Sequence, residues 1–194
     1  VSMADQFVPK MRYTFTRQSP STYRSPIYWQ TTVSEASNIL SLGYLAFGRK
    51  WNEKGKQMFK NPYAQFLKVE SDFRKTWRMS EHSTLVGHIN AGVIWSYGNA
   101  TSSPYSEQFY IGGANSIRAF TIRSLGPGSY RPPTDDRNGY LDQTGDFKLE
   151  ANIEYRFGIM GRLNGAVFLD AGNIWLLKKD PKRPGAELKW KGFL

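Results

Sequence analysis

The sequence predicts an all-β fold, and more specifically part of a transmembrane, antiparallel, up-and-down β-barrel. The chain has 194 residues, of which 40% are hydrophobic and 29 are aromatic (6 Trp, 11 Tyr and 12 Phe), yet its mean hydropathy is −0.53. Apolar and polar residues alternate along several segments that exceed the ~5–6 residues of a usual globular strand. No segment has the ~20 consecutive apolar residues of a membrane-spanning helix.

The composition excludes several functional classes. The chain contains no Cys, which excludes a disulfide scaffold, a thiol nucleophile and a Cys-ligated metal centre. The net charge is +10, and two basic loops contribute much of it, which permits attraction to lipid phosphates or acidic partners. Nucleic acid is not expected as a partner, because the aromatic residues belong to strand faces rather than to a basic groove.

The first third of the chain contains two short strand candidates and one helix candidate. Residues 11–17 and 27–33 alternate apolar and polar side chains. The pair Thr32 and Glu35 has the spacing of a capping box, and apolar residues follow it at nearly helical spacing. Residues 34–47 are therefore predicted to form a short amphipathic helix in a connection.

Residues 66–79 and 85–97 are the clearest strand candidates. Their odd-numbered residues are mostly apolar and their even-numbered residues mostly polar or charged, which is the period of a β-strand. Residues 80–84 alone separate them, so the two segments predict a tight hairpin. A shorter candidate covers residues 107–113.

Two further strand candidates lie near the C-terminus, at residues 147–157 and 163–171. Loops are predicted where Pro, Gly and basic residues gather, at 19–26, 49–56, 125–133 and 178–185. Long strands with aromatic residues near their ends favour a membrane barrel, in which the apolar face meets lipid and the polar face lines a wet lumen. A soluble all-β sandwich is the alternative on pattern alone.

Two segments carry a resemblance to a known family. Residues 109–120 read FYIGGANSIRAF and residues 167–172 read VFLDAG. They resemble the F-Y-x-G-G-x-x-S-x-R-G-F and F-x-D-x-G segments of the BamA/TamA outer-membrane insertase superfamily, also called the bacterial surface antigen family. The wording is most similar to TamA-like members of Bacteroidota. Ala119 departs from the family pattern, which has Gly there, and Gly tolerates a positive φ that Ala does not.

The resemblance implies a domain organisation. Family barrels have about sixteen strands, so residues 1–194 are expected to be an incomplete outer-membrane barrel domain with about seven strands. Residues 34–47 would be a helical periplasmic connection and residues 114–145 a large outward loop that folds back into the barrel. The hairpin at 80–84 would also face outward. The chain is expected to be an internal fragment without the periplasmic repeat domains, because it shows no signal peptide and ends without a further strand.

The resemblance also implies a site. Four residues are expected to form the loop-locking motif: Ile117, Arg118, Ala119 and Phe120. Arg118 is expected to reach the lumenal carboxylates Asp170 and Glu154, since a guanidinium suits carboxylate pairing. Three glycines would permit close approach of the loop: Gly112, Gly113 and Gly172.

No metal or cofactor is expected. The two histidines, His82 and His88, are too few for a metal cluster. The acidic residues of the large loop do not have the spacing of a calcium loop; they are Asp135, Asp136, Asp142 and Asp146.

The resemblance implies assembly or translocation at the bacterial outer membrane rather than an enzyme activity. The expected clients are unfolded outer-membrane or surface proteins, with membrane lipids and accessory assembly subunits as further potential partners. A general insertase, a specialised translocation subunit and a two-partner secretion pore fit the sequence equally well. The alternatives from other classes are a passive porin-like channel and a soluble all-β binding module.

Overall fold

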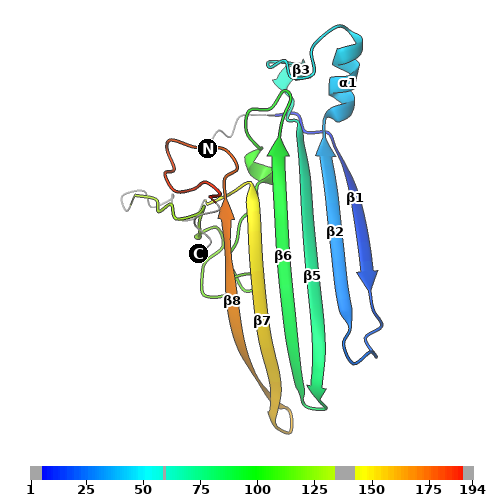
Figure 1. Ribbon diagram of the computed structural model, residues 1–194, viewed down its shortest axis with the longest axis vertical. Helices are drawn as coiled ribbons and strands as arrows, with labels where there is room; N and C mark the ends of the chain where they lie inside the picture. The colour runs from blue at the N-terminus through cyan, green and yellow to red at the C-terminus, as the bar shows by residue number, and fades with distance from the viewer. Residues whose placement is uncertain (1–5, 59, 134–142, 190–194) are drawn as a thin grey trace.

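The computed structural model describes residues 6–58, 60–133 and 143–189. Its main element is one six-stranded antiparallel sheet, in the order β1-β2-β5-β6-β7-β8 (Figure 1). These strands are β1 (Lys10–Gln18), β2 (Ile27–Ala36), β5 (Phe66–Ser80), β6 (Ser83–Ser96), β7 (Phe147–Met160) and β8 (Leu163–Trp175). The other elements are the helix α1 (Asn38–Ala46), the 3₁₀ turn η1 (Tyr105–Glu107) and a ribbon of β3 (Gln57–Met58) with β4 (Asn61–Pro62). The predicted all-β fold is confirmed.

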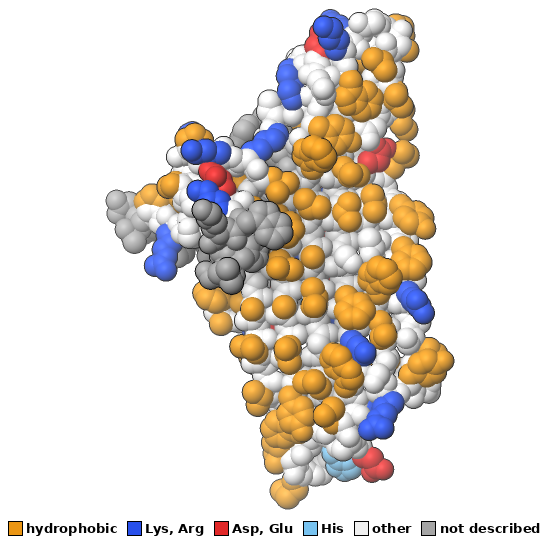
Figure 2. All heavy atoms as spheres, in the orientation of Figure 1, with side chains coloured by type: hydrophobic (Ala, Val, Ile, Leu, Met, Phe, Trp, Pro, Cys, Tyr) orange, Lys and Arg blue, Asp and Glu red, His pale blue; other side chains and the backbone are white. Residues whose placement is uncertain are grey.

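The two faces of the sheet differ in chemistry. The register pairs odd-numbered residues with odd-numbered ones, so that Val69 lies between Val33 and Val93. Apolar side chains on this face are exposed, including Ile153 (53%) and Leu169 (69%), and hydrophobic side chains spread over all the strands on the face seen in Figure 2. We call this side the apolar face and the opposite side the polar face. Exposed apolar side chains over a whole sheet fit contact with lipid.

The two ends of the sheet differ in their connections. Residues 81–82 and 161–162 make tight turns at one end, the turn end. Residues 37–65 and 97–146 join strands at the opposite end, the loop end (Figure 1). The helical connection and the large loop therefore lie on the same side, and the hairpin at residues 80–84 lies on the other. The expectation of a periplasmic helix opposite an outward large loop is wrong in this respect.

The cause of that error is the strand candidate at 107–113, which is wrong. The segment follows η1 and makes a single bridge, between Phe109 and Gly145. Its alternation comes from burial within the loop, since Phe109 and Ile111 are buried and Tyr110 is 45% exposed. Because residues 107–113 are not a strand, the chain runs along the sheet one time fewer before the large loop than predicted. Every connection before that loop therefore lies at the opposite end of the sheet from the predicted one.

The helix begins later than predicted. Thr32 and Glu35 belong to β2, where they pair with Glu70 and Leu67 of β5, so the capping-box assignment is wrong. Ser37 precedes the helix in a left-handed conformation with φ of 61° and makes no side-chain cap hydrogen bond. Within the described ranges, no helix is long and apolar enough to cross a membrane.

Candidate functional site

The connection between β6 and β7 covers residues 97–146, which is longer than the expected 114–145, and we call all of it the large loop. Its described residues fold over the polar face near the loop end. Phe109 lies on Gly92 of β6, where a Cβ atom would come within 2.5 Å of the phenyl ring. The Lys68 ammonium lies 4.6 Å from the centroid of the same ring. Backbone hydrogen bonds of 2.9 Å join Phe109 and Gly145 in both directions. A glycine in the strand thus admits an aromatic side chain of the loop.

A small apolar core fixes this part of the loop. Near the loop end the polar face carries apolar side chains in place of polar ones, and the loop adds its own. The cluster consists of Ala36, Ala64, Phe66, Ile94, Phe109, Ile111, Ile117 and Ile174. Burial of such side chains contributes roughly 1.5–3 kcal/mol each for the large ones. The core therefore holds the loop on the sheet independently of its charges.

The loop turns sharply at its two adjacent glycines. Gly112 and Gly113 have φ values of 106° and 93°, a region that residues with a side chain rarely adopt. The Gly112 N–H donates to Ser116 Oγ at 3.1 Å, and this hydroxyl donates to Glu150 Oε2 at 2.8 Å. The turn brings the following residues against β7 and β8.

Arg118 contacts both carboxylates that the family resemblance implies. Its Nε and Nη2 donate to the two oxygens of Asp170 at 3.0 and 3.2 Å, and its Nη1 donates to Glu154 Oε2 at 2.6 Å. The backbone N–H of Arg118 adds a hydrogen bond of 3.1 Å to Asp170. The guanidinium also lies 3.9 Å from the centroid of the Phe168 ring. Arg118 therefore joins the loop to β7 and β8 through charge-assisted and cation–π contacts.

The arginine is partly screened from water. Its side chain is 24% exposed, against 17% for Glu154 and 5% for Asp170. Burial lowers the pKa of Arg118, and the hydrogen bonds to Glu154 and Asp170 raise it by more, so the pKa ends above its ordinary value. The group stays cationic, and it balances part of the charge of its two carboxylate partners.

The other predicted site residues have different surroundings. Ile117 is buried in the apolar core, whereas Phe120 is 46% exposed. Positive φ occurs at only three non-glycine positions of the described chain, and Ala119 is not one of them. The alanine thus fits the local backbone without strain. A Cβ atom on Gly172 would come within 2.8 Å of the Leu149 carbonyl oxygen, so this glycine permits close approach between β7 and β8.

A chain of polar contacts, which the sequence did not reveal, extends from Asp170 across the sheet. Asn152 Nδ2 donates to Asp170 Oδ1 and to the Ser116 carbonyl oxygen, each at 2.9 Å. The His88 ring lies between Asn152 Oδ1 and Asp72 Oδ2, at 2.8 Å from each. Alternation alone placed His88 on the polar strand face. Its neighbour Asn152 could not be predicted, because the large loop separates β6 from β7 in the chain.

Replacing Asn152 with alanine is expected to loosen the loop by about 1–3 kcal/mol, because Asp170 and the Ser116 carbonyl each lose a buried donor. The measurement is the rate of limited proteolysis within the large loop of the full-length protein in detergent. The matched control is Asn164→Ala, because Asn164 is an exposed residue of β8 that lies, like Asn152, on the polar face of the sheet. Equal proteolysis of the Asn152→Ala variant and wild type would contradict the proposed role of Asn152.

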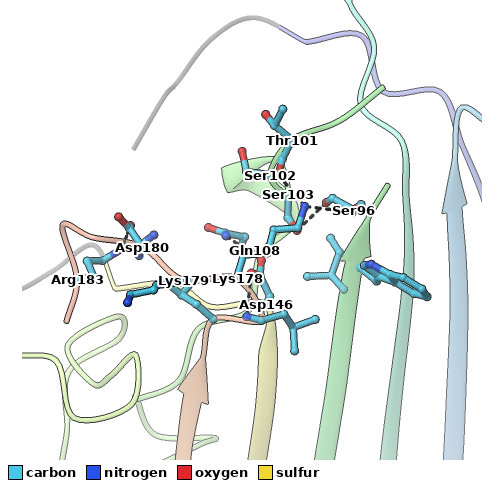
Figure 3. A pocket seen from close by; sticks show the side chains of 14 residues that line it. Ser96, Thr101, Ser102, Ser103, Gln108, Asp146, Lys178, Lys179, Asp180 and Arg183 are labelled. Carbon is cyan, nitrogen blue, oxygen red and sulfur yellow. Dashed lines mark hydrogen bonds and ion pairs between the residues drawn. The ribbon is translucent and has the colours of Figure 1, made fainter. Parts of the chain in front are cut away.

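The loop end also contains a pocket of about 250 Å³ between the large loop and the segment after β8 (Figure 3). Lys178 Nζ donates to the carbonyl oxygens of Thr101 at 2.8 Å and Ser96 at 3.4 Å. Asp146 accepts from the Gln108 amide at 3.1 Å and from the Leu177 N–H at 3.3 Å. The basic segment at 178–185 is therefore partly engaged with the large loop.

Among the described residues no group of three His, Cys, Asp or Glu side chains could hold a metal ion. Of the acidic loop residues, Asp135, Asp136 and Asp142 lie outside the described residues. Asp146 takes part in the hydrogen bonds at the loop end.

Comparison with known proteins identifies the family. A family model described as the Omp85 superfamily domain matches residues 44–189, which include both the large loop and β8. The chain belongs to the Omp85 superfamily. The predicted membership of the BamA/TamA outer-membrane superfamily and the predicted outer-membrane location are thereby confirmed. The closer likeness to TamA-like members of Bacteroidota stays a prediction.

Three relatives illustrate this membership of the Omp85 superfamily. The outer membrane protein assembly factor BamA of Neisseria meningitidis is 29% identical over 121 residues, covering 59% of this chain and 15% of that protein. Sorting and assembly machinery component 50 homolog A of Xenopus laevis is 30% identical over 129 residues, covering 64% and 26%. BamA of Nitratidesulfovibrio vulgaris is 27% identical over 135 residues, covering 65% and 16%. The chain thus matches about a quarter or less of the length of these curated relatives.

Proposed function

We propose that this chain supplies six neighbouring strands and the large loop of an outer-membrane barrel that inserts or exports β-barrel or surface proteins. The observation that carries the proposal is the Arg118 cluster, in which one loop residue joins carboxylates of β7 and β8. Within an Omp85 domain, such a contact fixes the loop across the polar face while the barrel acts on its client. The relatives named as assembly factors support the same role.

The mechanism needs no bond chemistry. The outer edges of β1 and β8 have no strand partner among the described residues, and open edges are not tolerated in hydrocarbon. We propose that further strands of the full-length protein pair with both edges and close the barrel. A weak seam elsewhere in that barrel would template a client strand by edge pairing, and local thinning of the bilayer would lower the barrier to insertion.

We also propose an orientation. Barrels of this kind have short periplasmic turns and longer outer loops. The tight turns at residues 81–82 and 161–162 would then face the periplasm, and α1 would lie outside with the large loop. This reverses the side predicted for the helix and for the hairpin at 80–84, and it keeps the large loop outward.

Depletion of the full-length protein is the test of this function. We expect the amount of folded β-barrel proteins in the outer membrane to fall and their unfolded forms to accumulate before insertion. Re-expression of the wild type should restore them, and re-expression of the Arg118→Ala variant should restore them less. An outer membrane with unchanged protein content after depletion would overturn the proposal.

A passive porin-like channel is the alternative from another class. The large loop covers part of the polar face that such a channel would leave open, which favours the assembly role. Conductance that stays unchanged while client insertion is absent would favour the channel. A soluble binding module is disfavoured by the extent of exposed apolar side chains over the sheet.

A further inference from the structure

One lysine on the apolar face, Lys75, lacks a polar partner within the part of the chain that the structure describes. Arg17, Glu35 and Lys75 are the charged residues of the six strands that share this face by register. A cation facing lipid is costly unless it is paired or reaches the membrane interface. Among the described residues, Lys75 has no carboxylate within ion-pair distance, and its ammonium lies 5.2 Å from the centroid of the Trp77 ring.

Lys75 lies beside an apolar groove with a volume of about 310 Å³. The side chains around it come from three adjacent strands: Phe73, Trp77, Leu85, Ile89 and Ile153. Gly87 lies next to the Trp77 indole and directly opposite Lys75 in the register, and a Cβ atom there would come within 3.1 Å of the indole ring. The groove therefore depends on a glycine at this position.

Further barrel strands cannot cover the groove. It lies over β5, β6 and β7, and each of these strands already has a partner on both sides. In the closed barrel the groove consequently still faces the surrounding membrane. Its occupant must come from the lipid phase or from another membrane protein.

The position of the lysine along the strand selects the occupant. Trp77 and Tyr155 lie two residues nearer the turn end than Lys75 and its row partner Ile153, and Tyr155 stacks on Phe157 at 5.7 Å. Aromatic side chains at strand ends mark the membrane–water interface. A long lysine side chain near that level can extend its ammonium to the phosphates of lipid headgroups.

We propose that this groove binds an anionic glycerophospholipid, with its phosphate on Lys75 and one acyl chain over Gly87. Charge complementarity favours an anionic lipid. By register, the nearest other charged residue of this face within the six strands is Arg17, in the row of Phe73, and it is also cationic. A zwitterionic headgroup would bring its ammonium close to two cations that have no carboxylate partner in the described ranges. The groove would thus retain one lipid while the rest of the apolar face exchanges its lipids.

The experiment is native mass spectrometry of the full-length protein in mild detergent, supplied with equal amounts of phosphatidylglycerol and phosphatidylethanolamine. Wild type is expected to retain phosphatidylglycerol preferentially. Lys75→Gln should reduce the retention of phosphatidylglycerol about fivefold to tenfold, as expected for the loss of one charge near the membrane surface. The retention of phosphatidylethanolamine should not change. Lys75→Arg should keep the retention of phosphatidylglycerol, and Gly87→Leu should abolish it by filling the groove.

The matched control is Arg162→Gln, which removes an exposed cation at the same end of the sheet and outside the groove. It should retain lipid as the wild type does. The proposal is overturned if Lys75→Gln and wild type retain phosphatidylglycerol equally, if both lipids fall together, or if Arg162→Gln has the same effect. Heat-modifiable electrophoretic mobility establishes that each variant is folded, and Lys75→Arg decides the matter should Gly87→Leu fail to fold.

Discussion

Replacing Arg118 with alanine is expected to release the large loop from β7 and β8. Asp170, which is only 5% exposed, would be left without its cationic partner, whereas Glu154 would keep its ion pair with Arg156. Loss of one partner of a buried ion pair costs about 3–5 kcal/mol, and we expect about 3 kcal/mol here because the Arg118 side chain is 24% exposed. The measurements are proteolysis of the loop and recovery of folded outer-membrane proteins in depleted cells.

The matched control for this variant is Arg131→Ala, an exposed arginine of the same loop. It should leave proteolysis and client assembly as in the wild type. A double variant with Arg118→Ala and Asp170→Ala should lose less than the sum of the two single variants, because both remove the same contact. Full additivity would mean that the two side chains act separately and would refute the cluster as a unit.

Replacing Gly112 with alanine should have the second large effect. A Cβ atom at this position would lie 2.2 Å from the Thr121 carbonyl oxygen, and φ is 106°. Backbone in this region costs about 1–3 kcal/mol for residues with a side chain. The clash adds to this cost by forcing apart the loop segments that contain Gly112 and Thr121. We expect the loss of the turn that brings Arg118 to the sheet, measured as loop proteolysis and reduced thermal stability of the barrel.

Gly48→Ala separates the two causes. Gly48 also has a positive φ, of 80°, but nothing lies within 4 Å of a Cβ atom there. This control should cost only the conformational part, about 1–3 kcal/mol, and less than Gly112→Ala. Equal effects of Gly48→Ala and Gly112→Ala would show that the close approach to Thr121 is unimportant.

Period-two alternation predicted all six strands of the sheet, because each strand separates an apolar face from a polar one. It failed at residues 107–113, where a loop segment alternates for another reason: Phe109 and Ile111 enter the apolar core while Tyr110 points outward. The apolar spacing within the helix was correctly recognised. Its start was not, since the polar residues Thr32 and Glu35 fit a strand as well as a helix cap.

The candidate site was predictable only in part. The contact of Arg118 with Asp170 and Glu154 came from a family motif, and no pattern within the sequence would have suggested it. Asn152 and His88 carry no such motif, and their proximity follows from the register between β6 and β7. Lys75 and Gly87 likewise become neighbours only through pairing of β5 with β6.

The contacts of Arg118 also set an order of events during folding. Asp170 lies 52 residues after Arg118 in the chain, and Glu154 lies 36 residues after it. The loop cannot complete its attachment until β7 and β8 have both paired, because its partners belong to those strands. Contacts at such sequence separation form late, after the chain has paid the entropy of closing the intervening segment. Full attachment of the loop therefore requires that β7 and β8 are already in place in the barrel.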